Sequence, residues 1–512
     1  MLITLIISAF ALSFAFAPFP LRWLSYLAIV PLLFVIKKYS YKKVFWWGLL
    51  FGSFFALFHL WWLYFLIVPV EPITKMLLYL GVTILFIYLG LYTALFSIVT
   101  KYLGIIFAPL VWVVFEFIRT KSEIGFLWGF LGYTQTPYIP FIQLASIFGV
   151  YGISAWVLFI NVMIYWILTK KRKLTYLILL MLVFVIPLVY GLIRVKSLEP
   201  CLKAAIVQPN VGPKEKGDYE SRTRLTGELL SLINRASQEK PDLIILPETA
   251  TLTDITRNMQ LRDTIQGIID SSNVYLFTGT SLFTPGSPIY YNGAVLFKPG
   301  QSGFTEIYRK IHLVPFSERI PYADKIPLFR KIETGDMGDC TPGKEFTVFS
   351  IHPCESDTGR TWQSQSEETA SLSLSKTKRT LNFAGLICFE SILPDLTRGF
   401  TKRGADMLIN ITNDGWFSKT PGPHQHCELA IMRSVENGVP LIRCANNGIS
   451  LIADAYGRTK NRTKLFTKTI VFSSVSSPLS STFYRKYGDV FICISLGIIF
   501  VGFIIKLFRK ND

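Results

Sequence analysis

The chain has 512 residues, of which 51% are hydrophobic and only 17% are charged, and its formal net charge is +18. Its mean hydropathy is +0.41, whereas a soluble domain usually carries about a quarter charged residues. These values exclude a disordered chain, a coiled coil, a collagen and a small disulfide-stapled domain. They indicate an integral membrane protein with a substantial soluble part.

The first 195 residues are almost free of charge and predict seven membrane spans, because a span needs about 20 apolar residues. Residues 1–36 form two short spans, divided at Pro18-Phe19-Pro20. Residues 124–145 are crowded with Gly and Pro, and we expect a re-entrant or interfacial segment there. The other five predicted spans cover residues 44–70, 76–100, 102–115, 146–169 and 174–193. An eighth span is predicted at residues 490–505.

Basic residues cluster on alternate connections between these spans. The clusters lie at residues 37–43, 170–173 and 506–510. Under the positive-inside rule, they place both termini in the cytoplasm and the intervening domain outside it. The expected domains are therefore 1–195, with seven helices, an extracytoplasmic domain at 196–489, and a last span with a cytoplasmic tail at 490–512. An internal soluble domain would require all three clusters to be reversed.

Between residues 196 and 489, strand and helix patterns alternate. Short apolar runs at 203–208, 243–246, 274–279, 292–297, 383–388, 407–411 and 441–444 predict strands, and residues 222–239 and 425–437 have helical periodicity. This alternation predicts an α/β layered domain. Residues 355–380 are rich in Ser, Thr, Gln and charge, and they predict a surface insertion or flexible loop.

Three reactive residue types stand at predicted strand ends or in adjoining loops. They are Glu248 in LPETA, Lys310 in YRKIHLVPFSERIP and Cys388 in GLICFES. Each alone is commonly a loop carboxylate, a surface lysine or a small buried thiol. Together they supply the groups that acyl transfer through a thioester needs: a thiol nucleophile, a carboxylate base and a cation for the oxyanion.

The order and the contexts of these three residues resemble the carbon–nitrogen hydrolase (nitrilase) superfamily. Within it, the chain resembles the apolipoprotein N-acyltransferase family over nearly its whole length. The resemblance rests on VWVVFEFIRT, WGFLGYTQ, AAIVQPN, LPETA, KIHLVPFSERIP, ICFES, NITNDGWF…GPHQH and PLIRCANNGIS. It implies a membrane α-helical bundle of eight transmembrane helices that carries a nitrilase-like four-layer αββα sandwich.

The resemblance also implies roles for individual residues. Glu248 is the expected general base, Lys310 the oxyanion stabiliser and Cys388 the acylated nucleophile. Supporting residues are Glu318, Phe389 and Glu390, and residues expected to shape the substrate pocket are Asn413, Trp416 and Asn447. Two positions depart from the family pattern: Phe389 stands where Tyr is common, and Gly217 stands where a Trp is usual.

The implied reaction is a ping-pong transfer between two lipid substrates. A membrane phospholipid gives an acyl chain to the thiol, and the α-amino group of a diacylglyceryl-cysteine on an apolipoprotein then takes it. We expect a monomer in the bacterial cytoplasmic membrane, with its catalytic domain in the periplasm, no cofactor, no metal and no nucleic acid partner. Two other hypotheses stay open: a membrane-anchored amidase or nitrilase, and a non-catalytic paralogue that binds lipoprotein or lipid.

Some features have more than one interpretation. His424-x-His426-Cys427 contains zinc-ligand types, but its spacing matches no familiar zinc pattern. Glu116, near a predicted membrane boundary, is either functional or paired with Arg119 one turn on. The seven cysteines show no regular spacing and are odd in number, which leaves at least one unpaired.

Overall fold

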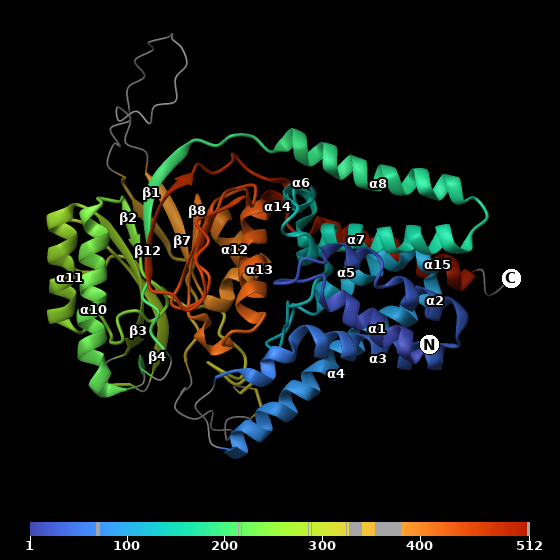
Figure 1. Ribbon diagram of the computed structural model, residues 1–512, viewed down its shortest axis with the longest axis horizontal. Helices are drawn as coiled ribbons and strands as arrows, with labels where there is room; N and C mark the ends of the chain where they lie inside the picture. Colours follow the sequence, from blue (N-terminus) through green and yellow to red (C-terminus); the bar gives the residue numbers. More distant parts are fainter. Residues whose placement is uncertain are drawn as a thin grey trace, which may run out of the picture.

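The computed structural model describes residues 1–67, 72–212, 215–216, 218–284, 286–287, 289–323, 325–326, 340–353 and 380–508. Gly217, Cys354 and nearly all of the predicted insertion at 355–380 lie outside these residues. The described chain forms an apolar helical bundle at one end and a layered α/β domain at the other (Figure 1).

The apolar helices of the bundle largely follow the predicted spans. They are α1 (Leu2–Ser13), α2 (Val30–Lys38), α3 (Tyr41–Leu60), α4 (Pro72–Leu103), α5 (Ala108–Ile118), α7 (Ala145–Thr169), α8 (Lys173–Arg194) and α15 (Val490–Phe508). Among the described residues, five helical segments are long and apolar enough to cross a membrane: α3 with the turn after it, α4, α7, α8 and α15. Both α1 and α5 are shorter, and α2 has only nine residues.

The segment between α5 and α7 is irregular, as its Gly and Pro content predicts. It contains the 3₁₀ helix η4 (Leu131–Gln135) and the four-residue helix α6 (Ile139–Ile142). All five residues of η4 are buried. Its backbone is satisfied inside the protein, as at Gly132, whose N–H donates to Ser154 Oγ at 2.8 Å.

Two mixed six-stranded sheets form the centre of the α/β domain. The first has the order β12-β1-β2-β3-β4-β5 and the second β11-β10-β9-β8-β7-β6. The first sheet contains β1 (Pro200–Gln208), β2 (Leu243–Ile245), β3 (Tyr275–Phe283), β4 (Tyr290–Phe297), β5 (Ile307–Arg309) and β12 (Thr469–Ser476). The second contains β6 (Val348–Ile351), β7 (Leu381–Ile387), β8 (Met407–Thr412), β9 (Leu441–Ala445), β10 (Leu451–Ala453) and β11 (Thr459–Lys460).

Helices cover the outer faces of the two sheets (Figure 1). The first sheet is covered by α10 (Tyr219–Gln238) and α11 (Met259–Ser272), and the second by α12 (Pro394–Lys402) and α13 (Gly422–Asn437). Apolar residues from both sheets, such as Phe277, Phe349 and Phe383, pack together in the core between them. This is the αββα layering that the sequence resemblance implies.

The helix α13 lies between the second sheet and the apolar bundle (Figure 1). All but one of its sixteen residues are buried. Arg22, from the bundle, makes a buried two-point ion pair with Glu428 of α13, at 2.6 and 3.0 Å. The N–H of Val150 in α7 donates to Glu436 at 2.8 Å. The bundle and the α/β domain are therefore joined through polar contacts that exclude water.

Candidate active site

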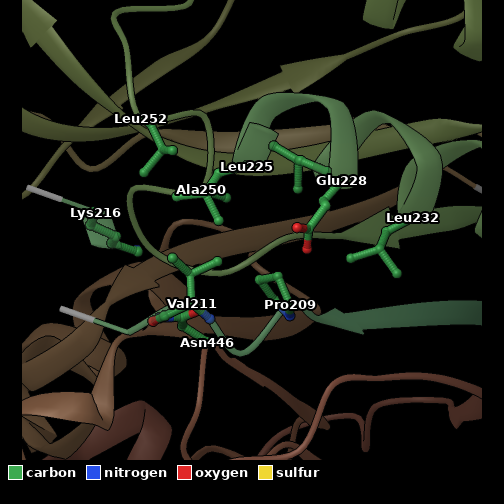
Figure 2. Close-up of a pocket in the computed structure, with 10 residues that line it drawn as sticks. Pro209, Val211, Lys216, Leu225, Glu228, Leu232, Ala250, Leu252 and Asn446 are labelled. Carbon is green, nitrogen blue, oxygen red and sulfur yellow. The ribbon is translucent and has the colours of Figure 1, made fainter. Parts of the chain in front are cut away.

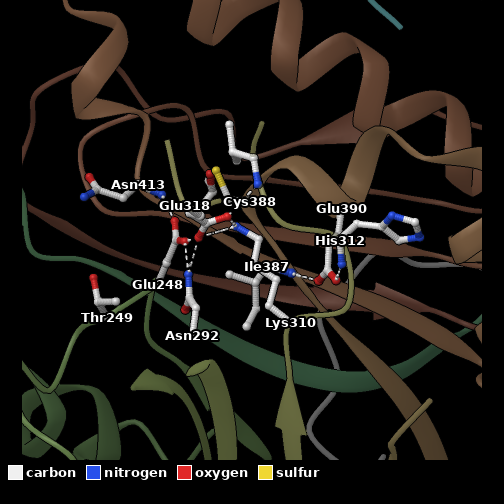
Figure 3. Close-up of polar contacts among 12 residues, drawn as sticks. Glu248, Thr249, Asn292, Lys310, His312, Glu318, Ile387, Cys388, Glu390 and Asn413 are labelled. Carbon is white, nitrogen blue, oxygen red and sulfur yellow. Dashed lines mark hydrogen bonds and ion pairs between the residues drawn. The ribbon is translucent and has the colours of Figure 1, made fainter. Parts of the chain in front are cut away.

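Glu248, Lys310 and Cys388 lie together where strands of the two sheets end (Figure 3). Glu248 follows β2, Lys310 follows β5 directly, and Cys388 follows β7 directly. Lys310 is 1% exposed and Glu248 is 7% exposed, so their charges interact away from bulk water. Their side chains are 3.8 Å apart between Nζ and Oε1.

Lys310 is held most closely by Glu318. Its Nζ lies 2.9 Å from Oε1 and 2.8 Å from Oε2 of that carboxylate. Burial would lower the pKa of Lys310, but Glu318 and Glu248 raise the pKa above its usual value. The ammonium group therefore keeps its proton and supplies a fixed positive charge. The backbone N–H of Val314 also donates to Glu318 at 2.8 Å, which fixes the carboxylate.

Glu248 is oriented by two hydrogen bonds and has a perturbed pKa. Asn292 Nδ2 donates to Oε1 at 2.8 Å, and the backbone N–H of Asn413 donates to Oε2 at 2.9 Å. Burial raises the pKa of Glu248, while the charge of Lys310 opposes that rise. A carboxylate whose pKa is raised is a better proton acceptor, so this side chain suits a general base.

Cys388 stands at a sharp turn from β7 into the 3₁₀ helix η6 (Cys388–Ile392), where its φ is +54°. A non-glycine residue there is strained by about 1–3 kcal/mol, and the surroundings hold it. Its carbonyl oxygen accepts from Ser391 Oγ at 3.0 Å and Asn410 Nδ2 at 3.3 Å. The N–H groups at the start of η6, including that of Phe389, lack intrahelical partners and are available to an oxyanion.

The thiol of Cys388 is protonated in the resting site. Burial, and then the negative charge of Glu248, raise the pKa of this thiol to about 12, while Lys310 opposes them. The nucleophile must therefore lose its proton to a neighbouring base as it attacks. Glu248 is the carboxylate whose charge acts on it most strongly.

Glu390 supports the turn that carries Cys388 rather than reaching the reacting groups. Its Oε1 accepts from the hydroxyl of Tyr308 at 2.7 Å and from the N–H groups of Ile311 at 2.7 Å and His312 at 3.1 Å. Its Oε2 accepts from the N–H of Ile387 at 2.9 Å. Burial raises the pKa of this carboxyl to about 7. The Glu390 side chain thus links the end of β5, which carries Lys310, to the end of β7, which carries Cys388.

The three predicted pocket residues have different positions. Asn413 holds Glu248 through its backbone, and its side-chain oxygen accepts from Asn446 at 3.0 Å. Trp416 is half-buried, and its carbonyl accepts from the N–H of Ile67 in the bundle at 2.9 Å. Asn447 donates to the carbonyl of Val211 at 3.4 Å. Only Asn413 bonds directly to one of the three reactive residues.

Phe389 connects the site to the apolar bundle through a ring contact. Its ring stacks on Trp128, which precedes η4, with 5.9 Å between the ring centroids and 21° between the planes. Trp128 in turn contacts Trp62, and Trp62 contacts Phe417. At this position an aromatic ring serves packing against the bundle, which needs no hydroxyl group.

Two site residues were not predicted from the sequence. Asn292, in β4, donates through the same Nδ2 atom to Glu248 and Glu318, at 2.8 and 2.9 Å. Lys216 donates to the carbonyl oxygens of Glu248 and Thr249 at 3.2 and 3.3 Å, and it lines a pocket beside α10 (Figure 2). Burial lowers the pKa of Lys216 to about 8. Asn292 could have been predicted as a site residue because it is a polar residue at a buried position of a strand.

The histidine pair is not arranged as a zinc site. His426 Nδ1 lies 3.0 Å from Asp414, and its Nε2 lies 3.3 Å from the carbonyl of Cys388. In the part of the chain that the structure describes, no three His, Cys, Asp or Glu side chains are grouped as metal ligands. No ion pair joins Glu116 and Arg119 either. Glu116 accepts from Trp112 and from the N–H of Leu131, and Arg119 donates to the carbonyl of Trp128.

Two layered sheets with Glu, Lys and Cys at adjoining strand ends define a carbon–nitrogen hydrolase. The model of that family, described as carbon-nitrogen hydrolase, matches residues 203–482. A second model, described as apolipoprotein N-acyltransferase N-terminal domain, matches residues 8–163. The chain belongs to the apolipoprotein N-acyltransferase family.

Individual relatives agree with this assignment. A Geobacter metallireducens protein named apolipoprotein N-acyltransferase is 30% identical over 495 residues, covering 92% of this chain and 88% of that protein. A Rickettsia prowazekii protein of the same name is 31% identical over 429 residues, covering 80% and 77%. Among solved structures, Saccharomyces cerevisiae Nit3, of the nitrilase superfamily, matches 55% of this chain and 92% of its own, with 17% identity and a TM-score of 0.38.

Proposed function

We propose that this protein transfers a fatty acyl chain from a membrane phospholipid to the α-amino group of the diacylglyceryl-cysteine that begins an apolipoprotein. The observation that carries the proposal is a Glu–Lys–Cys set whose nucleophile adjoins an aromatic contact with an apolar bundle. That placement suits lipid substrates, whereas hydrolysis of small soluble amides or nitriles gives no reason for the bundle.

The first half-reaction forms a thioester. Glu248 accepts the thiol proton while Cys388 Sγ attacks the ester carbonyl carbon of the phospholipid. Lys310 and the N–H of Phe389 stabilise the tetrahedral oxyanion. The carbon–oxygen bond then breaks, and Glu248 returns the proton to the departing oxygen, which leaves as lysophospholipid.

The second half-reaction uses the same groups in the reverse sense. The α-amino nitrogen of the acceptor attacks the thioester carbon, and Glu248 accepts a proton from that nitrogen. The carbon–sulfur bond breaks, an amide is formed, and the proton passes to the thiolate. Glu318 and Asn292 act as positioning residues throughout, since both hold Lys310 or Glu248 in place.

The proposal includes a membrane topology with eight spans and both termini in the cytoplasm. The start of α1, the end of α15 and the connection between α7 and α8 lie at one end of the bundle, and the α/β domain lies at the other (Figure 1). The basic clusters near these ends support a cytoplasmic position for them. The catalytic domain then faces the periplasm.

The direct test of the proposed function is a transfer assay with a diacylated lipopeptide and a phospholipid. We expect a mass increase of one acyl chain on the peptide with the unchanged enzyme and none with Cys388→Ala. Acetylation of the peptide's α-amino group should abolish the increase. Free fatty acid as the only product, with or without lipopeptide, would show a hydrolase and contradict the proposal.

A further inference from the structure

A cavity lies in the apolar bundle, between α3, α4, α5 and the segment that follows α5. Its walls are mainly apolar, with Phe55, Leu60 and Leu89 among them. Five side chains with polar atoms also line it: His59, Thr93, Trp112, Arg119 and Trp128. The bundle therefore contains a mainly apolar cavity that four nitrogen-bearing side chains also line.

Three of these side chains have a buried nitrogen without a hydrogen-bond partner in the described structure. The atoms are His59 Nε2, Arg119 Nε and Trp128 Nε1. His59 is only 3% exposed and Trp128 only 5% exposed, so water outside the protein cannot serve these atoms. Unsatisfied buried donors cost about 1–3 kcal/mol each, so a ligand that offers them an acceptor would be stabilised in this cavity.

The hydrogen-bond network around His59 fixes the hydrogen on Nε2. The indole Nε1 of Trp62, which can only donate, bonds to Gln425 Oε1 at 3.0 Å. The amide nitrogen of Gln425 consequently faces His59. It lies 3.4 Å from Nδ1 and 3.3 Å from the backbone carbonyl oxygen of that histidine. Because that nitrogen donates, Nδ1 accepts and Nε2 carries a hydrogen. All three unpartnered atoms are thus donors, and their ligand must present an acceptor oxygen.

The charge around the cavity favours a neutral acceptor over a phosphate. Arg119 is cationic, but Glu116, three residues earlier on α5, carries the opposite formal charge. The guanidinium group also donates to the carbonyl of Trp128 and lies over the ring of Phe130. A neutral carbonyl oxygen fits these donors and the small free space between the apolar walls.

We propose that this cavity binds the ester carbonyl of a diacylglyceryl group; its free space of about 20 Å³ admits the carbonyl oxygen, while the acyl chain stays outside it. The inference rests on the proposed function, in which the phospholipid donor and the lipoprotein acceptor both contain such esters. The bound ester is not the one that reacts, since the reacting carbonyl must lie at Cys388. Trp128 links the two places, because its indole N–H belongs to the cavity while its ring stacks on Phe389 at 5.9 Å. One ester is therefore an anchor that positions the other at the nucleophile.

The test compares binding of a diester phospholipid with binding of its diether analogue, which lacks both carbonyl oxygens. Cys388→Ala enzyme is used in micelles so that no lipid is consumed. We expect the diester to bind about tenfold more tightly, which corresponds to about 1.4 kcal/mol and to one or two hydrogen bonds. The same comparison with dialkyl and diacyl lipopeptides identifies which of the two substrates uses the anchor.

Substitutions assign the preference to the donors. Trp128→Phe and His59→Phe should each reduce the diester-to-diether ratio toward one, and His59→Gln, which keeps an N–H donor, should retain part of it. The matched control is Trp156→Phe, because its indole N–H already donates to the carbonyl of Val183 at 2.7 Å. That variant should keep the full ratio.

Equal affinities for diester and diether lipids would overturn the proposal and leave the cavity with water only. A full ratio in both Trp128→Phe and His59→Phe would also overturn it. Because binding is measured without turnover, failure here is distinguishable from failure of the proposed function. Loss of acyl transfer together with an intact ester preference would contradict the reaction and leave the anchor standing.

Discussion

At the scale of single residues, the site pairs a buried protonated thiol with a buried carboxylate of raised pKa. Burial drives both shifts, and the charge of Lys310 opposes both. Proton transfer between the two groups therefore costs less than it would if only one of them were buried. The fixed ammonium then stabilises whichever negative charge the reaction creates.

Removal of Lys216 should alter the pH dependence of the acylation step. Its positive charge lowers the pKa of Glu248, and Glu248 must be deprotonated to act as the base. In Lys216→Met, the pKa of Glu248 rises further, so the acid limb of the rate profile should move to higher pH. Single-turnover acylation rates measured against pH check this. Lys298→Met, at a lysine paired with Glu306, should leave the limb in place, and an unshifted limb in Lys216→Met would contradict the assignment.

Glu390→Gln should disable the turn that carries Cys388. The carboxylate accepts four hydrogen bonds, and an amide would turn an N–H₂ group toward some of those donors. We expect a loss of about 2–3 kcal/mol in the free energy of unfolding and an acylation rate reduced by at least tenfold. Thermal unfolding and thioester formation measure the two effects. If both stay at the level of the unchanged enzyme, Glu390 does not support the nucleophile.

The sequence predicted the three reactive residues at strand ends, and the family resemblance supplied Glu318 and Asn413, but Asn292 was not predicted. Glu248 and Glu318 meet at Asn292, which is a single amide within an otherwise ordinary strand pattern. Glu116 was expected either to be functional or to pair with Arg119; it accepts from an indole one turn back and from the first N–H of η4 instead of pairing with Arg119, and a functional role stays a prediction. Spacing along a helix shows which side chains can meet, whereas tertiary contacts decide which do.

At the scale of elements, α13 is the helix through which the α/β domain contacts the apolar bundle. Its sequence has helical periodicity but contains Glu428, Arg433 and Glu436, which usually indicate a solvated face. In the structure these charges are buried and paired, with Glu428 bonded to Arg22 and Arg433 3.1 Å from Glu436. The partner of Glu428 lies more than 400 residues away along the chain, so no local pattern could have predicted the burial.

Breaking the ion pair between Arg22 and Glu428 should destabilise the whole protein. Glu428→Gln leaves the guanidinium of Arg22 buried without a counter-charge, which costs about 3–5 kcal/mol. The double variant Arg22→Met/Glu428→Leu should recover most of that loss, because it buries no charge. Thermal unfolding in detergent measures the changes. Glu228→Gln, in an exposed pair with Arg224, is the control and should change the free energy of unfolding by less than about 1 kcal/mol. An equally small effect of Glu428→Gln would show that the Arg22–Glu428 ion pair contributes little to stability.

At the scale of the whole molecule, the reactive residues lie between two sheets and close to the bundle. Hydropathy predicted most apolar helices near their observed bounds, whereas the orientation that the charge clusters indicate stays a prediction. The irregular segment between α5 and α7 was expected to be re-entrant or interfacial, and it supplies Trp128, whose ring stacks on Phe389. That contact could not be predicted, because the Gly and Pro residues which reveal the irregularity do not specify its path.

The proposed topology predicts which parts of the chain are reachable from outside an intact inner membrane. Single cysteines in a cysteine-free background at Lys171 and at Lys464 of the α/β domain would be tested with a membrane-impermeant maleimide on spheroplasts. We expect labelling at residue 464 at once, and labelling at residue 171 only after the membrane is opened. The reverse pattern would invert the orientation and place the domain in the cytoplasm.

In the proposed reaction, Cys388 carries the acyl chain between two lipids. The measurement is incubation of the purified enzyme with acyl-labelled phospholipid, without acceptor, followed by mapping of the label. We predict one label per protein on Cys388, released by neutral hydroxylamine, lost in Cys388→Ala and transferred to an added diacylated lipopeptide. No label on the unchanged enzyme, or equal label on Cys388→Ala, would contradict the account.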